Sequence, residues 1–290
     1  MPSILSATGI KQMVLTEIFT YGFIQRALIS GVLVGMLCAV LGVFLVLRRL
    51  SLIGDGLAHV TFGSVALALA LHTKPLYVTL AALPPVLLSS LGILRLTERM
   101  KLYGDAAIGI VSAAGIAGGV ILAAVSGGFN IDLFGYLFGS ILAISLNETL
   151  LAVTLFCLVT GVISGYYKQL FAITFDEELA RSSGIRVERF NALLALLTAL
   201  TVVLAMKVVG IMLVSALLII PPVTALQISR GFRATLLSAA AISGFSVASG
   251  IILSFLLNLP TGAFIVLLNI FLLLLALAIK PLLARGEVSF

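Results

Sequence analysis

Asp55 and His59 are the residues of this chain whose types and spacing best suit chemistry. They lie four positions apart within an apolar stretch, so on a helix they would share one face, one turn apart. Ionisable side chains are costly in lipid and usually face a cavity or a pathway. The pair offers one oxygen and one nitrogen ligand, a set that suits zinc and is acceptable to manganese or iron. Two ligands leave a tetrahedral site incomplete, so the pattern favours a transient metal contact.

The same spacing fits two structural roles. Asp55 and His59 could satisfy each other as a buried pair, or Asp55 could cap a helix that starts at the membrane interface. Small residues surround the pair and leave room for another helix or an ion: Gly54, Gly56, Ala58 and Gly63.

A second pattern lies in the longest charged segment, residues 168–189. Thr174 followed by Glu177 fits a capping box, and Gly184 suits the left-handed position after a helix end. We therefore expect a short helix at 174–184, either a solvated connector or a helix that docks on a partner and passes motion to the bundle. The residues of this segment that we single out are Phe175, Asp176, Glu177, Glu178, Leu179, Ala180 and Gly184.

Pro221 and Pro222 stand together within an apolar run. Proline removes a backbone donor, so we expect the pair to break the helix, either as a structural kink or as part of a cavity lining. The sequence contains no Walker A loop, GxSxG or HExxH motif and no paired catalytic carboxylates, so an enzyme is disfavoured.

The composition identifies the elements that must position these residues. The 290 residues carry 17 basic and 11 acidic side chains, whereas a soluble domain of this length would carry roughly 70 charges. With 61% hydrophobic residues and a mean hydropathy of +1.28, a soluble enzyme, a disordered chain and a nucleic-acid-binding protein are all excluded. The chain is predicted to be a polytopic membrane protein. No large extramembrane domain fits beside the spans, so any ATPase must be a separate chain.

Hydropathy predicts an all-α bundle in one domain, residues 1–290. We expect nine spans, or eight or ten if the pair around Lys207 is one broken helix or a short segment also spans. The predicted spans are 24–47, 52–71, 76–94, 106–125, 146–166, 190–206, 209–228, 234–257 and 261–279. Residues 10–22 are interpreted as an interfacial helix, and residues 131–145, too short to span, as a re-entrant or surface helix.

The distribution of basic residues predicts the orientation. If Arg48 and Arg49 are cytoplasmic, thirteen of the 17 basic residues lie inside and four (Lys11, Arg26, Lys74 and Lys207) lie outside. By the positive-inside rule, the N-terminus is then outside and the C-terminus inside.

Several motifs in series resemble the permease subunits of bacterial metal-ion ABC importers, which take up zinc, manganese or iron. The matching stretches are RRLSLIGDGLAH at 48–59, DLFGYLFGSILA at 132–143, the 175–184 helix, VGIMLVSALLIIP at 209–221 and LPTG at 259–262. The resemblance covers about residues 20–280. Two departures stand out: Pro222 replaces a small residue, and Asn258 stands where relatives often carry Asp.

The resemblance implies a type II ABC importer-like permease in the bacterial cytoplasmic membrane, working as a homodimer. It implies two cytoplasmic ATPase subunits and an external metal-binding protein as partners, and no tightly bound cofactor. By that likeness Asp55 and His59 line the metal route and the 176–184 helix contacts the ATPase. Pro221 and Pro222 are expected to serve as a gate or a kink.

Two further expectations concern the cargo and the rival mechanism. Residues 127–139 and 205–210 look more like the zinc members of the family, so zinc is expected ahead of manganese or iron. The rival is a proton- or sodium-coupled secondary transporter, in which matched broken helices would recur in two repeats. Only the break at Pro221 is apparent in the sequence. A membrane structural protein would leave the intramembrane Asp–His pair without a purpose.

Overall fold

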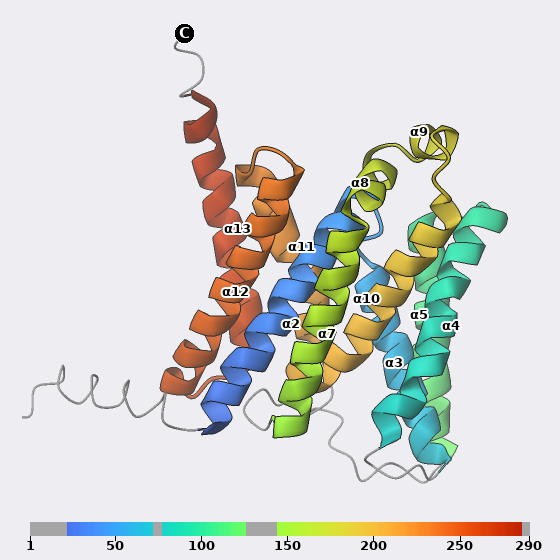
Figure 1. The fold of residues 1–290 in the computed structure, drawn as a ribbon. Coiled ribbons are helices and arrows are strands. Elements are labelled where there is room, and N and C mark those ends of the chain that lie inside the picture. The colour runs from blue at the N-terminus through green and yellow to red at the C-terminus, as the bar shows by residue number, and fades with distance from the viewer. Residues whose placement is uncertain (1–21, 72–76, 126–143, 286–290) are drawn as a thin grey trace, which may run out of the picture.

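The computed structural model of the chain describes residues 22–71, 77–125 and 144–285, and the described residues form helices. Nine of these helices are long and apolar enough to cross a membrane. Figure 1 shows how the helices are arranged. They are α2 (Gly22–Leu47), α3 (Ile53–Ala70), α4 (Val78–Arg99), α5 (Gly104–Val125), α7 (Leu146–Gly165), α10 (Val187–Val209), α11 (Ile211–Ile228), α12 (Phe232–Leu257) and α13 (Thr261–Arg285). The described part of the chain therefore confirms the prediction of nine spans.

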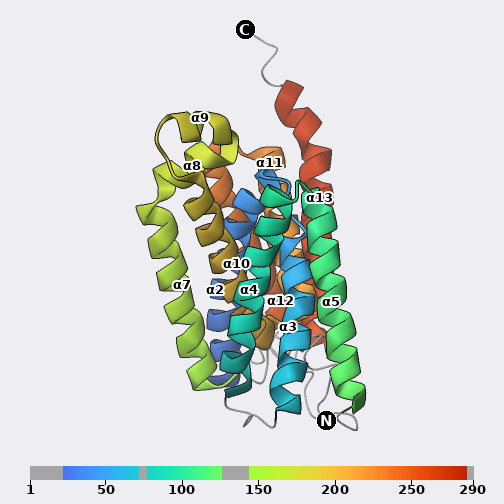
Figure 2. The same ribbon diagram turned by 90° about the vertical axis from the view of Figure 1, so that its right-hand side faces the viewer.

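The helices form one bundle, in which α2 and α3 each pack against several other helices. α2 packs against α12, α11 and α7, and α3 packs against α5, α4, α11 and α10 (Figures 1 and 2). Two short helices, α8 (Tyr167–Phe175) and α9 (Glu177–Ser182), lie at the end of the bundle where α2, α4, α7 and α11 finish. We call this end the α9 end.

Glycines bring the helix backbones into close contact. A methyl group on Gly35 would lie 2.9 Å from side-chain atoms of Ser243 and Val247 on α12, and one on Gly115 would lie 2.7 Å from Cα of Val60 on α3. Such small residues permit close helix packing in a membrane. There the hydrophobic effect does not drive helices together, so van der Waals contact between close backbones matters more. Gly161 and Gly165 on α7 are four residues apart, but no neighbour in the described part of the subunit lies within 4 Å of a methyl group added to either.

The expected helix break at Pro221 and Pro222 is wrong. Both prolines are buried inside a continuous α11, and α4 also carries a proline pair, Pro84 and Pro85. Pro222 has no N–H to offer the carbonyl of Leu218, and that carbonyl lies against α2 so closely that a methyl group on Gly42 would overlap it. Packing against a neighbouring helix therefore lets α11 pass through the prolines without breaking.

The 166–186 segment also differs from the expectation. Residues 167–175 form α8, a helix that the sequence analysis missed, and α9 spans only 177–182 of the expected 174–184. Thr174 does not cap α9, because its hydroxyl donates to the Leu170 carbonyl at 2.6 Å. The cap is Asp176, which has an extended backbone and accepts a hydrogen bond from the Leu179 N–H at 2.9 Å.

A capping box does occur at the start of α7. There the Ser145 side chain accepts a bond from the Glu148 N–H, and the Glu148 carboxylate accepts one from the Ser145 N–H. The pair around Lys207 is two helices, since α10 and α11 meet at Gly210 with a φ of 85°. The interfacial helix expected at 10–22 and the re-entrant helix expected at 131–145 lie outside the described residues, apart from their last one and two positions.

Candidate metal site and coupling helix

Asp55 and His59 occupy the first two turns of α3. The His59 Nε2 lies 3.5 Å from the Asp55 Oδ2, as the four-residue spacing predicted, and their side chains are 31% and 49% exposed respectively. A third polar group comes from α11, where the Ser215 hydroxyl donates to the Asp55 Oδ1 at 3.3 Å. Because both ionisable side chains are only half-buried, this polar triad can be reached from outside the subunit.

The structure rules out one of the alternative roles of Asp55. The N-cap of α3 is Leu52, and no side chain caps this helix start. The Asp55 carboxylate instead faces His59 and Ser215. A buried pair also fails to describe the site, since about half of the Asp55 side chain remains exposed.

The glycines around the pair accommodate neighbouring helices. A side chain on Gly56 would meet Ile108 of α5 and one on Gly54 would meet Leu218 of α11, while Gly63 lies against the backbone of Gly115. α3 is thereby held between α5 and α11, and its open side carries Asp55 and His59. Among the described residues, no group of three or more His, Cys, Asp or Glu side chains is close enough to hold a metal ion.

The segment predicted to contact the ATPase, α9 and its flanks, exposes some of its predicted residues and buries others. Phe175 and Leu179 are 60% and 63% exposed, and Glu178 is exposed as well. Ala180 is buried with Ile173 and Val187 in a small cluster that attaches α9 to the bundle. Gly184 has a φ of 83°, so the expectation of a left-handed residue after the helix is confirmed.

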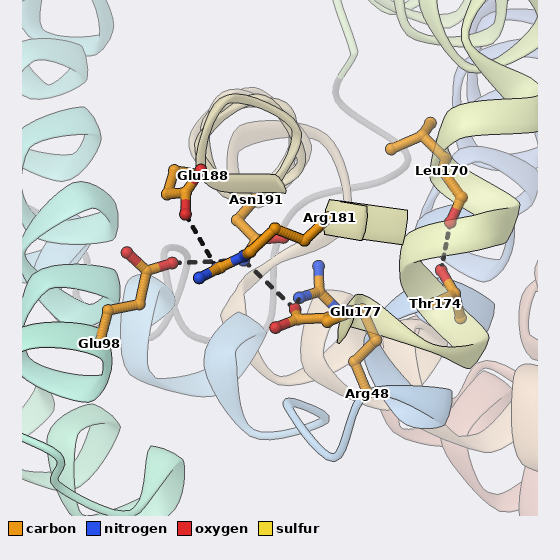
Figure 3. Close-up of polar contacts among 8 residues, drawn as sticks. All are labelled: Arg48, Glu98, Leu170, Thr174, Glu177, Arg181, Glu188 and Asn191. Atoms are coloured by element: carbon orange, nitrogen blue, oxygen red, sulfur yellow. Dashed lines mark hydrogen bonds and ion pairs between the residues drawn. The ribbon is translucent and has the colours of Figure 1, made fainter. Parts of the chain in front are cut away.

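Glu177 faces the bundle, where it joins a polar cluster that the sequence analysis missed (Figure 3). Its carboxylate forms an ion pair with Arg48 and accepts a hydrogen bond from the Asn191 Nδ2 at 3.3 Å. The same Asn191 nitrogen donates to Glu98 Oε1 at 3.2 Å. We call Arg48, Glu98, Glu177 and Asn191 the Arg48 cluster. They line a cavity of about 340 Å³ between the residues that follow α2 and helices α4, α8, α9 and α10.

Arg48 is the most buried charge of this cluster, with 11% of its side chain exposed. Burial lowers the pKa of the guanidinium, and the neighbouring carboxylates of Glu177 and Glu98 act in the opposite direction. A buried charge is tolerated only when it is paired and hydrogen-bonded. Glu177 therefore holds α9 to the residue that directly follows α2. Arg48 entered the sequence analysis as a topology signal and as part of a family motif, and its contact with Glu177 was missed because the two residues lie 129 positions apart.

The fold and these two sites define a class of protein: a polytopic membrane transport protein with a half-exposed polar triad among its spans and an anchored helix at one end. Residues 20–280 match the family described as the ABC 3 transport family. The chain belongs to this family, and it is a membrane permease subunit without ATPase activity of its own. The secondary transporter considered above is thereby excluded.

Two curated relatives illustrate the similarity. The manganese transport system membrane protein MntC of Halalkalibacterium halodurans is 32% identical, covering 91% of this chain and 90% of MntC. The high-affinity zinc uptake system membrane protein ZnuB of Haemophilus influenzae is 31% identical, covering 87% of this chain and 95% of ZnuB. A relative named for manganese and one named for zinc are thus about equally similar to this chain. The expected preference for zinc does not follow from them.

Two solved structures share the fold. PsaBC from Streptococcus pneumoniae, in complex with a Fab, matches with a TM-score of 0.79 and 30% identity, covering 90% of this chain and 93% of the matched chain. A transporter in an inward-facing conformation matches with a TM-score of 0.74, covering 96% of this chain and 91% of that one. At 14% identity, the second match shows the fold alone.

Proposed function

We propose that this permease imports a divalent transition metal, and that Asp55 and His59 contact the ion as it crosses the membrane. The observation that carries this proposal is the half-exposed Asp55–His59–Ser215 triad within otherwise apolar spans. The names of the relatives MntC and ZnuB support a metal as the cargo.

The spacing of the pair suits one bound ion. Zinc takes nitrogen and oxygen ligands at about 2.0–2.2 Å, so two ligands of a tetrahedral ion stand about 3.4 Å apart. The His59 nitrogen and the Asp55 oxygen are 3.5 Å apart, so both could bind one ion with little movement. With only two strong ligands from one chain, the ion would be held weakly, and a transport site must release its cargo.

Zinc is the cargo that we propose, with manganese as the alternative. An imidazole ligand suits zinc, whereas manganese is better served by carboxylates, carbonyls and water. The discriminating measurement is uptake of labelled zinc in the presence of excess manganese, and the reverse, with the cognate ATPase and metal-binding protein present. Uptake of manganese that zinc fails to inhibit would overturn the proposed cargo while leaving the proposed pathway in place.

The permease is proposed to work as a homodimer with two ATPase subunits and an external metal-binding protein. A two-fold dimer that brings the open sides of α3 together would supply two Asp55–His59 pairs, enough to complete a four-ligand site for a moment during transport. The two-component name of the similar structure, PsaBC, supports a permease that works together with another subunit.

We place the α9 end at the cytoplasm of a bacterial cell, with the N-terminus outside and the C-terminus inside. The described residues at this end include Arg48, Arg95, Arg181 and Arg233, whereas Arg26 lies at the opposite end. This segregation agrees with the positive-inside rule.

The Arg48 cluster provides a short path from the ATPase to the metal. In this mechanism ATP binding closes the ATPase dimer, which pushes on the exposed Phe175 and Leu179 of α9. Glu177 passes the movement to Arg48, and residues 49–52 connect Arg48 to the first turn of α3, which contains Asp55. Pro221 and Pro222 lie on α11, the helix that supplies Ser215. A movement of α11 at these prolines would shift Ser215 relative to Asp55 and so open or close the metal route.

The test is metal uptake by the full transporter reconstituted in vesicles. Asp55→Ala and His59→Ala are each expected to abolish uptake while the permease still co-purifies with its ATPase. Ser64→Ala is the matched control, since the Ser64 hydroxyl bonds only the Val60 carbonyl of the same helix among the described residues. Unchanged uptake by both variants would remove Asp55 and His59 from the pathway.

A further inference from the structure

A hollow between α8 and α12, at the α9 end, carries positive charge that neither the metal site nor the Arg48 cluster uses. Its volume is about 660 Å³, and it lies where α7 ends at Gly165 and α12 begins at Phe232. The lining residues that matter here are Tyr167, Lys168, Gln169, Arg233, Leu236 and Leu237. We call it the α8–α12 hollow.

The two cations of the hollow have no carboxylate partner among the described residues. The ion pairs formed by described arginines join Arg48 to Glu177 and Arg181 to Glu188, and no described carboxylate lines the hollow. Arg233 instead lies over the Tyr167 ring, 5.3 Å from its centroid, a contact that orients the guanidinium without neutralising it. The hollow therefore offers two positive charges, a phenol and an amide to an anion.

The apolar part of the hollow continues onto an exposed apolar face of α12. Leu237 is 74% exposed, and the exposed face continues along α12 through Ala241 to Phe245, two helical turns further into the span. A soluble anion or a soluble protein would not cover this apolar face. A phospholipid would cover it, because its phosphate lies at headgroup depth and its acyl chains lie along the adjoining span.

We infer that the α8–α12 hollow binds the headgroup of an anionic phospholipid. Lys168 and Arg233 contact the phosphate, Gln169 donates a hydrogen bond to it, and Leu236 and Leu237 contact an acyl chain. α8 leads directly into the coupling helix α9, so a lipid bound here would steady the corner that positions α9. The inference requires the spans to cross a membrane, but it does not depend on the identity of the metal.

The test measures retention of phosphatidylglycerol by the purified full chain, using native mass spectrometry. The variant Lys168→Gln/Arg233→Gln is expected to retain the lipid about fivefold to tenfold less than the wild type. The matched control Arg99→Gln/Lys101→Gln removes two exposed charges from the same end and should retain it normally. Lys168→Arg/Arg233→Lys keeps both charges and should restore retention, which shows that the loss is not a failure to fold.

Five outcomes would overturn the inference. Equal loss in the control variant would show diffuse surface attraction, and no loss in either variant would show that the hollow binds no such lipid. Equal retention of phosphatidylcholine would remove the requirement for an anionic headgroup, and displacement by millimolar inorganic phosphate would indicate a site for a free anion. If Lys168→Gln/Arg233→Gln loses the ATPase yet keeps the lipid, the hollow is a protein-docking surface.

Discussion

The two polar sites of this permease are built in opposite ways. In the Asp55–His59–Ser215 triad, contacts of 3.3–3.5 Å join half-exposed groups from two helices. In the Arg48 cluster, a nearly buried guanidinium and Asn191 tie together α2, α4, α9 and α10. Loose contacts between half-exposed groups allow a ligand to be exchanged, whereas a buried cation such as Arg48 resists separation from its carboxylate partners. Under the proposed mechanism, the first site suits release of an ion and the second suits transmission of force.

Apart from removing Asp55 or His59 themselves, the largest expected effect comes from breaking the Arg48 cluster. Arg48→Met leaves Glu177 and Glu98 without their buried cation, so α9 should no longer be held to the end of α2. We expect metal uptake to fall at least about tenfold, equivalent to about 1.4 kcal/mol of lost coupling, while ATP hydrolysis continues. The measurement is the ratio of metal transported to ATP hydrolysed.

Arg48→Lys serves as the conservative comparison for that experiment. It keeps a positive charge beside Glu177 but loses the planar guanidinium, so uptake should fall between that of the wild type and that of Arg48→Met. If Arg48→Met transports normally, the cluster only supports the fold, and the contrast between the two sites disappears.

The next effect tests whether backbone packing, as well as polar groups, holds the triad in place. A methyl group on Gly115 would lie 2.7 Å from the Val60 Cα and 3.1 Å from the His59 carbonyl oxygen. Gly115→Ala should therefore push α5 away from α3 and destabilise the protein by about 1–3 kcal/mol. Gly109→Ala is the matched control on the same helix, because nothing lies within 4 Å of its added methyl group.

Thermal unfolding and uptake should be measured together for both glycine variants. We expect Gly115→Ala to lower both the melting temperature and uptake, and Gly109→Ala to lower neither, since alanine favours the helix. A Gly115→Ala protein with normal melting and normal uptake would show that α5 does not set the position of the metal pair.

The sequence alone predicted the spans and the Asp55–His59 pair because both depend on local order. Hydropathy placed nine spans within a few residues of their observed ends, and a spacing of four put the two side chains on one helix face. Ser215 lies 160 positions from Asp55, so only the packing of α11 against α3 brings them together. No local pattern in a single sequence predicts that contact.

The two capping-box patterns show the limit of local patterns in another way. Thr174–Glu177 and Ser145–Glu148 have the same spacing, yet only the second pair caps a helix. Thr174 is still inside α8, where its hydroxyl bonds the Leu170 carbonyl, and Glu177 is drawn to Arg48. Tertiary contact with a buried cation therefore decides which of two equal local signals is used.

Removing Ser215 from the triad should have a modest effect. Its hydroxyl donates one bond, 3.3 Å long, to a carboxylate that stays half-exposed. Ser215→Ala is expected to change the metal concentration for half-maximal uptake by about twofold to fivefold, corresponding to about 0.5–1 kcal/mol. Complete loss of uptake would make Ser215 a required ligand and would contradict a loosely held triad.

The smallest effect is expected at the second ion pair of α9. Its removal tests whether the Arg48 cluster transmits movement because Arg48 is buried or only because its charges are paired. Arg181 Nη2 lies 2.8 Å from Glu188 Oε1, a shorter contact than any in the metal triad, but both side chains are more than half exposed. Exposed pairs contribute little because water screens them. Arg181→Gln should therefore leave the ratio of transport to ATP hydrolysis within about twofold of the wild type. If Arg181→Gln uncouples the transporter as strongly as Arg48→Met does, α9 acts through its overall charge, and the contact of Glu177 with the buried Arg48 has no special role.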